Sequence, residues 1–222
     1  MPKKFVLCSL VFILSAVLLV AGCGGGNNTE QPAESSGTVS SDKGGELSAL
    51  FAKGSAVDEL YYEFVIAEGE KEEARGKAWV KGTRMKNEMT VNDETIISIF
   101  DTAKAENLVY VEGMDMAMLS TFDPQALGAY DSPTNYSDDL DLSSMKIVGT
   151  ETYDGHKCKV IAMTDEQGQE GAKMWVSEKY GIPLRIEDEI AGVTIEYKNL
   201  KVGSVPDDVF ELPPGVKITN NR

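Results

Sequence analysis

A cysteine near the start of the chain has the setting that indicates the most definite chemistry. The tetrapeptide Val20-Ala21-Gly22-Cys23 ends a long apolar run, Phe5–Val20, that begins after two lysines. A positive segment, an apolar segment and a junction of small residues are typical of a secretion signal. We therefore expect residues 1–22 to be a lipoprotein signal peptide with a lipobox. The Cys23 thiol would then carry acyl chains such as palmitate.

One other interpretation of this segment stays open, because the run from Phe5 to Ala21 reaches the lower limit of length for a membrane-spanning helix. An ordinary cleaved signal followed by a chance cysteine is rejected, because Cys23 falls at the position that a lipobox requires. The small residues before Cys23 favour cleavage and lipidation. We expect an exported protein that is lipid-anchored to the outer face of the bacterial cell membrane, or to an outer membrane if the cell has one.

Three methionines at alternate positions, Met114, Met116 and Met118, form a second pattern with chemical potential. Thioether sulfur is a soft ligand suited to Cu(I), whereas flexible methionines also line adaptable apolar pockets. No histidine or cysteine stands near the run, so lining of a core or cavity is favoured over copper. We expect no metal and no cofactor. The neighbouring residues that would share the lining are Leu119, Phe122 and Leu127.

His156 and Cys158 stand two apart on one predicted strand face, where they could act as a base and a nucleophile or as two metal ligands. A competent site needs a third group that orients them or completes the ligand set. A turn histidine beside a buried cysteine is therefore the favoured interpretation. The chain also lacks a phosphate-binding glycine loop and an HExxH motif, so we expect no enzyme.

Composition limits the partners. The chain has 36 acidic and 21 basic residues and a net charge of −15. Nucleic acid and anionic lipid headgroups would repel such a surface, so we expect neither as a partner. Of the three cysteines, Cys8 leaves with the signal and Cys23 is acylated, which leaves Cys158 without a disulfide partner. A packed core must therefore stabilise the fold.

The chain after the signal divides into a linker and one domain. Residues 23–45 would form the lipidated N-terminus and a flexible linker, because they lack the large apolar residues that a core requires. Residues 46–222 suit a single domain by length. Apolar residues at helical spacing predict a short helix over 46–53, before Gly54.

Alternation of apolar and polar residues predicts about ten strands after this helix. Short turns such as Asp154-Gly155 join them, so we expect one antiparallel sheet that curls. The alternation is lost from Gly113 to about Ser144, a stretch expected to break the sheet and to help the helix cover its apolar face. The predicted strands are 60–67, 76–81, 84–91, 95–101, 108–112, 146–153, 157–164, 172–177, 184–189 and 193–200.

Several short motifs occur in a characteristic order in the C-terminal half. They are the hairpin of residues 149–160, the strand Lys173-Met174-Trp175-Val176, the turn Gly181-Ile182-Pro183-Leu184-Arg185 and the tail of residues 205–213. In these motifs the chain resembles the LolA-like lipoprotein carriers and the related lipid-binding lipoproteins of the mycobacterial LppX and LprG group. The order of elements agrees from Glu46 to Gly215. The resemblance implies a mainly β (α+β) fold, a strongly curved antiparallel half-barrel sheet capped by short helices.

The resemblance also implies a function. Such a protein would bind a hydrophobic ligand, the acyl chains of a lipid or lipoprotein, in a cavity under the curved sheet, for transfer or presentation at the envelope. An envelope sensor or protein-interaction module with a protein partner is the alternative, and Cu(I) binding by the methionine run is a third. The expected lining residues are Met114, Met116, Met118, Leu119, Phe122, Leu127, Leu184, Ile186, Val193, Ile195 and Tyr197.

Overall fold

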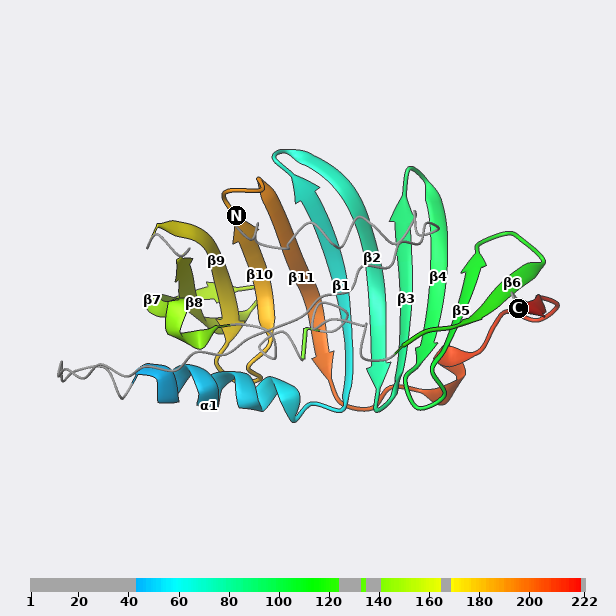
Figure 1. Ribbon diagram of the computed structural model, residues 1–222, viewed down its shortest axis with the longest axis horizontal. Helices are drawn as coiled ribbons and strands as arrows, with labels where there is room; N and C mark the ends of the chain where they lie inside the picture. Colours follow the sequence, from blue (N-terminus) through cyan, green and yellow to red (C-terminus); the bar gives the residue numbers. More distant parts are fainter. Residues whose placement is uncertain (1–42, 124–132, 135–140, 165–168, 221–222) are drawn as a thin grey trace, which may run out of the picture.

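The computed structural model describes residues 43–123, 133–134, 141–164 and 169–220. Twelve strands in these residues form one sheet in the order β12-β6-β5-β4-β3-β2-β1-β11-β10-β9-β8-β7. The sheet is strongly curved and does not close on itself, and the one α-helix of the described residues, α1 (Lys43–Ser55), lies beside it (Figure 1). The predicted class, a mainly β, LolA-like half-barrel, is confirmed.

The first six strands form a meander in which each strand pairs with the next, and the same holds from β7 to β11. Pairing of β1 with β11 joins the two meanders into one sheet, and every pair is antiparallel except the parallel pair β6 and β12. The strands are β1 (Glu59–Glu68), β2 (Lys71–Lys81), β3 (Arg84–Val91), β4 (Glu94–Asp101), β5 (Glu106–Val111), β6 (Met116–Thr121), β7 (Met145–Tyr153), β8 (His156–Thr164), β9 (Glu170–Ser177), β10 (Pro183–Asp188), β11 (Val193–Val202) and β12 (Lys217–Asn220).

Two strands differ from the sequence prediction. The sheet was expected to break after Gly113, but β6 continues it, because apolar residues on both faces of this strand obscure a period of two. β12 has only four residues, all exposed, and its register depends on pairing with β6 far away in the sequence. The other predicted cover of the sheet, the rest of the stretch up to Ser144, lies largely outside the described residues.

The helix was predicted over 46–53, and α1 extends that range at both ends. Its side chains Leu47, Leu50 and Phe51 are buried in the main core. Glu46 forms an ion pair with Lys159 of β8 at 3.1 Å. No helix of the described residues is long and apolar enough to cross a bilayer.

The sheet has two faces, which the strand register defines. We call the face that carries Leu60, Tyr62 and Ile66 the inner face, and the face that carries Tyr61 and Glu63 the outer face. The inner-face residue Ile66 lies opposite Ile195 of β11, and the row continues across β10, β9 and β8. Those further members of the row, all completely buried, are Ile186, Met174 and Ile161.

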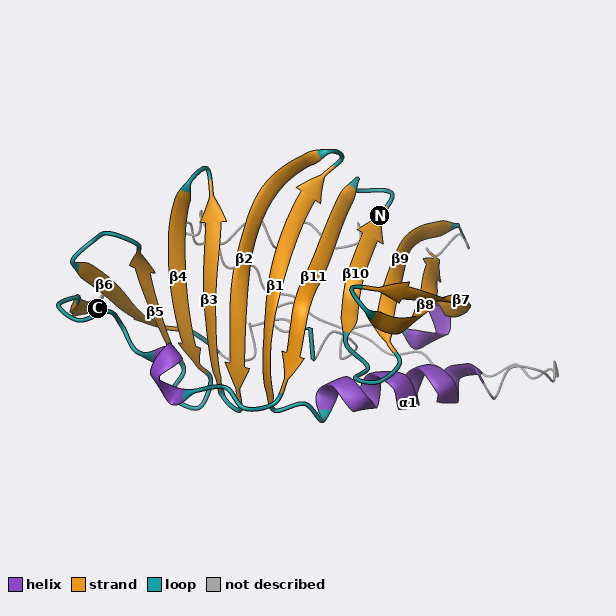
Figure 2. Ribbon diagram, turned by 180° about the vertical axis from the view of Figure 1, so that it is seen from behind, coloured by secondary structure: helices purple, strands orange, loops and turns teal. Residues whose placement is uncertain are grey.

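The sheet can be divided by what lies against its inner face. The covered half comprises β1, β2 and β7–β11, and α1 lies beside the ends of several of these strands (Figures 1 and 2). Ala78 and Val80 of β2 are buried in the core cluster that contains the α1 side chains. The open half comprises β3–β6 and β12. Most of the buried core belongs to the covered half. A second cluster, built on Ile97, Tyr110 and Ala117, lies on the outer face of the open half.

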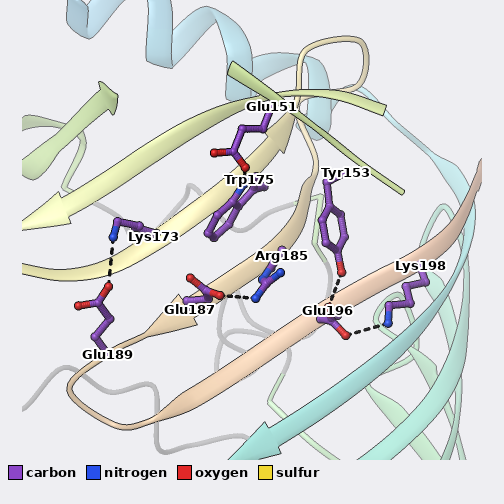
Figure 3. Close-up of polar contacts among 9 residues, drawn as sticks. All are labelled: Glu151, Tyr153, Lys173, Trp175, Arg185, Glu187, Glu189, Glu196 and Lys198. Carbon is purple, nitrogen blue, oxygen red and sulfur yellow. Dashed lines mark hydrogen bonds and ion pairs between the residues drawn. The ribbon is translucent and has the colours of Figure 1, made fainter. Parts of the chain in front are cut away.

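The outer face of the covered half is closed by the β7–β8 hairpin, which folds back over it (Figure 3). Tyr153 of β7 donates a hydrogen bond to Glu196 of β11 at 2.6 Å, although three strands separate β7 from β11 in the sheet. Trp175 donates from Nε1 to Glu151 at 2.8 Å. The Arg185 guanidinium lies near both rings, 5.8 Å from Tyr153 and 5.2 Å from Trp175. These contacts hold the hairpin in its folded-back position.

The outer face of the open half is covered by the segment that follows β11. Within this segment, Asp207 forms an ion pair with Lys81 at 3.1 Å and another with Arg84. Further along, Leu212 and Val216 pack against the cluster around Tyr110. The open half is therefore covered on its outer face and differs from the covered half on its inner face.

Candidate hydrophobic ligand site

The inner face of the open half carries three rows of side chains across β3–β6. One row is wholly apolar, with Met89, Ile96 and Val111 in register. Another row begins at Met85 and a third begins at Asn87, each reaching β6. The row that begins at Met85 continues through Phe100, Asn107 and Ser120. The row that begins at Asn87 continues through Ser98, Val109 and Met118.

None of the residues in these three rows carries a charge. The outer face of the same strands differs, since Lys86 and Glu88 form an ion pair there at 2.9 Å. A charged group removed from water costs far more than a polar amide or hydroxyl. The inner face of the open half is therefore suited to an apolar ligand.

Burial differs sharply between the two halves of the sheet. Every residue of β3 is partly exposed, whereas four of the six residues of β10 are buried. β3 is paired on both sides, so its exposure does not come from a position at the sheet edge. The inner face of the open half is thus an apolar surface with room for a further layer.

The predicted lining residues of the last two long strands lie on the inner face, as the alternation indicated, but in the covered half. Leu184 and Ile186 are completely buried, Ile195 and Tyr197 are nearly so, and Val193 is partly buried. All five belong to the core beside α1 or pack against it. Burial also raises the pKa of the Tyr197 hydroxyl. In this structure they form packed core, and their role in ligand contact stays a prediction.

The methionine run is exposed in this structure. Met114, Met116 and Met118 are 59%, 53% and 47% exposed. They lie at the β6 side of the open half, where β12 is the only further strand of the described sheet. They do not belong to the packed core, and their role in lining a ligand site stays a prediction.

The other three predicted lining residues, Leu119, Phe122 and Leu127, lie in different places. Leu119 lies on the outer face, opposite Leu108. Phe122 packs edge-on against Phe100 of the inner face, with ring centroids 6.0 Å apart. Leu127 lies outside the described residues. Of the predicted lining residues between Met114 and Leu127, Met116 and Met118 lie on the inner face of β6 and Phe122 contacts Phe100 of that face.

Two shallow hollows of about 260 and 230 Å³ lie elsewhere on the surface. The larger lies between α1 and the turn after β9, and is lined by Leu50, Lys53 and Glu178 among others. The smaller lies on the outer face beside Tyr61 and Trp79. None of the predicted lining residues borders either hollow. The candidate site is accordingly an open face and not either of these depressions.

The pair His156 and Cys158 lies on β8, but the thiol is buried and unreactive in character. Its Sγ donates to the backbone oxygen of His156 at 3.5 Å, and desolvation raises the pKa of the Cys158 thiol to about 11. Reactive cysteines have lowered pKa values. The described residues contain no cluster of three His, Cys, Asp or Glu side chains that could hold a metal ion.

Sequence reasoning missed the residues at the centre of the site. The strand 84–91 was predicted, and its alternation places Met85, Asn87, Met89 and Val91 on one face. The asparagine in the middle of this series concealed its apolar character. The usable signal was the pair of methionines flanking it at a spacing of four residues.

The fold and the face together define a class. The chain is a mainly β protein whose strongly curved, unclosed sheet carries three uncharged, partly exposed rows on the inner face of one half.

No family model matches the chain. It is 43% identical over 86 residues to the uncharacterized protein MJ0687 of Methanocaldococcus jannaschii, a match that spans 37% of this chain and only 25% of that protein. The chain therefore matches about a quarter of the length of this relative.

Solved structures share the architecture at low identity. An uncharacterized conserved protein from Thermus thermophilus superposes with a TM-score of 0.53 and 10% identity, over 80% of this chain and 98% of that one. The Mycobacterium tuberculosis lipoprotein LppX has a TM-score of 0.44 and 15% identity, and the match covers 68% of this chain and 93% of that one. A chain of the Pseudomonas aeruginosa MucA/MucB complex has a TM-score of 0.45 and 14% identity, and the match covers 81% of this chain and 64% of that one. The Thermus thermophilus structure agrees with the predicted architecture at the level of the fold, and an identity of 10% extends the likeness no further.

Proposed function

We propose that the inner face of the open half binds the acyl chain of a lipid or lipoprotein, for transfer or presentation at the cell envelope. One observation carries the proposal. Strands β3–β5 are paired on both sides, yet their uncharged inner-face rows around Met89 and Ile96 are only partly buried. An apolar ligand would complete the burial of these rows.

The dimensions and the chemistry of the face suit an alkyl chain. Four adjacent strands span about 14 Å at a strand spacing of about 4.8 Å. Each methylene removed from water contributes about 0.8 kcal/mol. Met85, Met89 and Met118 have flexible, polarizable side chains that adapt to the position of the chain. The energy of binding would therefore come from burial and would require no charged contact on this face.

The proposal includes an anchor. Lipidation of Cys23 would tether the domain through the linker of residues 23–45, whose root-mean-square reach is roughly 25 Å. The net charge of −15 would keep the domain soluble above a negative membrane. A tethered domain would capture or hand over its ligand locally.

The binding step is tested with a fluorescent palmitate analogue titrated into the full chain. Met89→Glu places a charge in the apolar row, and we expect at least a tenfold loss of affinity. Thr90→Glu, one residue along β3 on the outer face, is the matched control and should bind normally. Native mass spectrometry of the purified chain should also reveal co-purified lipid. Failure of the unaltered chain to bind the probe or any lipid would refute the function.

The anchor is tested separately with Cys23→Ser. We expect this variant to lose the acyl mass and leave the membrane fraction, while its fold is unchanged because the described domain begins at Lys43. An unmodified Cys23 in the native membrane fraction would contradict the proposed tether and leave the binding face in place.

A further inference from the structure

Two asparagines interrupt the apolar inner face of the open half. Asn87 lies on β3 and Asn107 on β5, and both are partly buried. The Oδ1 atoms of both amides are shielded from solvent and accept no hydrogen bond from any of the described residues. A buried acceptor without a partner costs about 1–3 kcal/mol. The face therefore contains two acceptors that the described residues leave without a donor.

The neighbours of the two amides in the sheet do not satisfy them. Asn87 lies between Ala78 and Ser98 in its row; alanine has no polar group, and the Ser98 hydroxyl does not donate to the Asn87 Oδ1. Asn107 lies between Phe100 and Ser120. The Ser120 hydroxyl donates its hydrogen to the backbone oxygen of Asn107 at 3.3 Å, so it does not donate to the side-chain amide of Asn107.

A purely structural role does not account for these residues. Leucine has the same branching at Cγ as asparagine, although it is larger, and would offer apolar contact to Met85, Met89 and Phe100 without the cost of an unpaired acceptor. Asparagines in hydrogen-bonded positions occur elsewhere in the sheet, for example Asn199, which donates to Glu63 at 2.9 Å. The amides of the open half differ in that they lie on the face proposed to receive the ligand. Because each Oδ1 is shielded in this structure, the amide has to turn about its Cβ–Cγ bond to meet a ligand hydroxyl.

We propose that Asn87 and Asn107 are hydrogen-bonding subsites for hydroxyl groups carried on the apolar part of the ligand. The preferred ligand is then a hydroxylated acyl chain and not a plain one. This inference rests on the proposed function, since it concerns the same face. A hydroxyl group both donates and accepts, so it pairs with either end of an amide.

The spacing of the two amides favours one hydroxyl at each. Their Cα atoms are separated by two strand spacings and by two residues along the strand, a distance of roughly 12 Å. A single hydroxyl therefore reaches one amide at a time, and the two positions act independently. Between them lie Ser98 and Phe100 of β4.

The test compares two fatty acids that differ by one hydroxyl group. Stearate and 12-hydroxystearate each compete with the fluorescent palmitate analogue for the full chain. We expect 12-hydroxystearate to bind roughly threefold to tenfold more tightly, the effect of one added hydrogen bond in a buried setting. In the double variant Asn87→Leu/Asn107→Leu, we expect this preference to vanish while stearate binds at least as tightly as before.

Two controls separate folding from recognition. Thermal unfolding of the double variant should occur at the same or a higher temperature, because the variant removes two unpaired acceptors. Lys77→Leu, on the outer face of β2, should leave the preference for 12-hydroxystearate intact.

The outcomes distinguish this inference from the proposed function. Equal affinity for both fatty acids in the unaltered chain would overturn the hydroxyl subsites and would indicate that the two amides pair with water. It would leave the proposed acyl binding in place. A preference that survives in the double variant would also overturn them. Displacement of the probe by neither fatty acid would refute both proposals.

Discussion

The covered and open halves belong to one continuous sheet, but the main core is packed almost entirely against the covered half. In the covered half, Leu184 is completely buried in the core cluster that contains the α1 side chains. In the open half, the described residues that pack against the sheet, such as Leu212 and Val216, lie on its outer face. The difference shows that strand pairing builds the sheet, whereas the elements lying across it decide which part becomes core.

The largest difference should appear in the free energy of unfolding. Leu184→Ala removes a completely buried side chain of the covered half and should cost about 2–5 kcal/mol. Met89→Ala in the open half should cost about 1 kcal/mol or less, because its side chain is already partly exposed. Urea denaturation measures both. Equal losses would show that the open half is packed as tightly as the covered half.

High pH should also act on the covered half. Desolvation raises the pKa of the Cys158 thiol from 9.0 to about 11, so the folded chain keeps a proton that the unfolded chain releases. Stability is then fully present below pH 9 and falls as the pH rises from 9 to about 11, by on the order of 1 kcal/mol after allowance for screening. The free energies of unfolding of Cys158→Ala and of the unaltered chain should therefore approach each other as the pH rises from 9 to about 11. Parallel pH dependence of the two would contradict the assignment.

The hydroxyl of Tyr153 tests the folded-back hairpin. Tyr153→Phe removes the 2.6 Å hydrogen bond to Glu196, and we expect a loss of about 1 kcal/mol. Tyr61→Phe removes a similar bond to Glu63 on the more exposed part of the outer face and should cost less. If both variants lost the same stability, the hairpin would not depend on this contact more than the surface does.

The smallest effect is expected where the C-terminal segment meets β3. Arg84→Gln removes an exposed ion pair with Asp207 and should cost less than about 1 kcal/mol. Hydrogen exchange should increase around Tyr110, where this segment covers the outer face, and not around Leu184. Increased exchange throughout the chain would indicate that the two halves unfold together.

Local patterns predicted much of the fold. Alternation located ten of the twelve strands and the inner-face parity of Leu184 and Ile186, and helical spacing located α1. β6 and β12 were missed because one has apolar residues on both faces and the other depends on a distant partner.

The candidate site was predictable only in part. The sequence indicated an apolar, methionine-bearing face, but it did not separate core residues such as Ile195 from exposed ones such as Met116. That distinction depends on where α1 and the C-terminal segment lie, which no pattern within a strand records. Asn87 and Asn107 were not predicted as site residues. Their relative position depends on the pairing of β3 and β5 with β4, which lies between them, and a pattern within one strand does not record that pairing.

The proposed function places an acyl chain on the inner face of the open half. A palmitate analogue with a photoreactive diazirine, bound to the full chain and activated by light, marks the residues that it touches. Peptide mass spectrometry should locate the label on β3–β6, at residues such as Met85, Met89 and Val109, and not on Leu184 or Ile186. Label on the covered half or on the outer face, or no specific label at all, would contradict the claim.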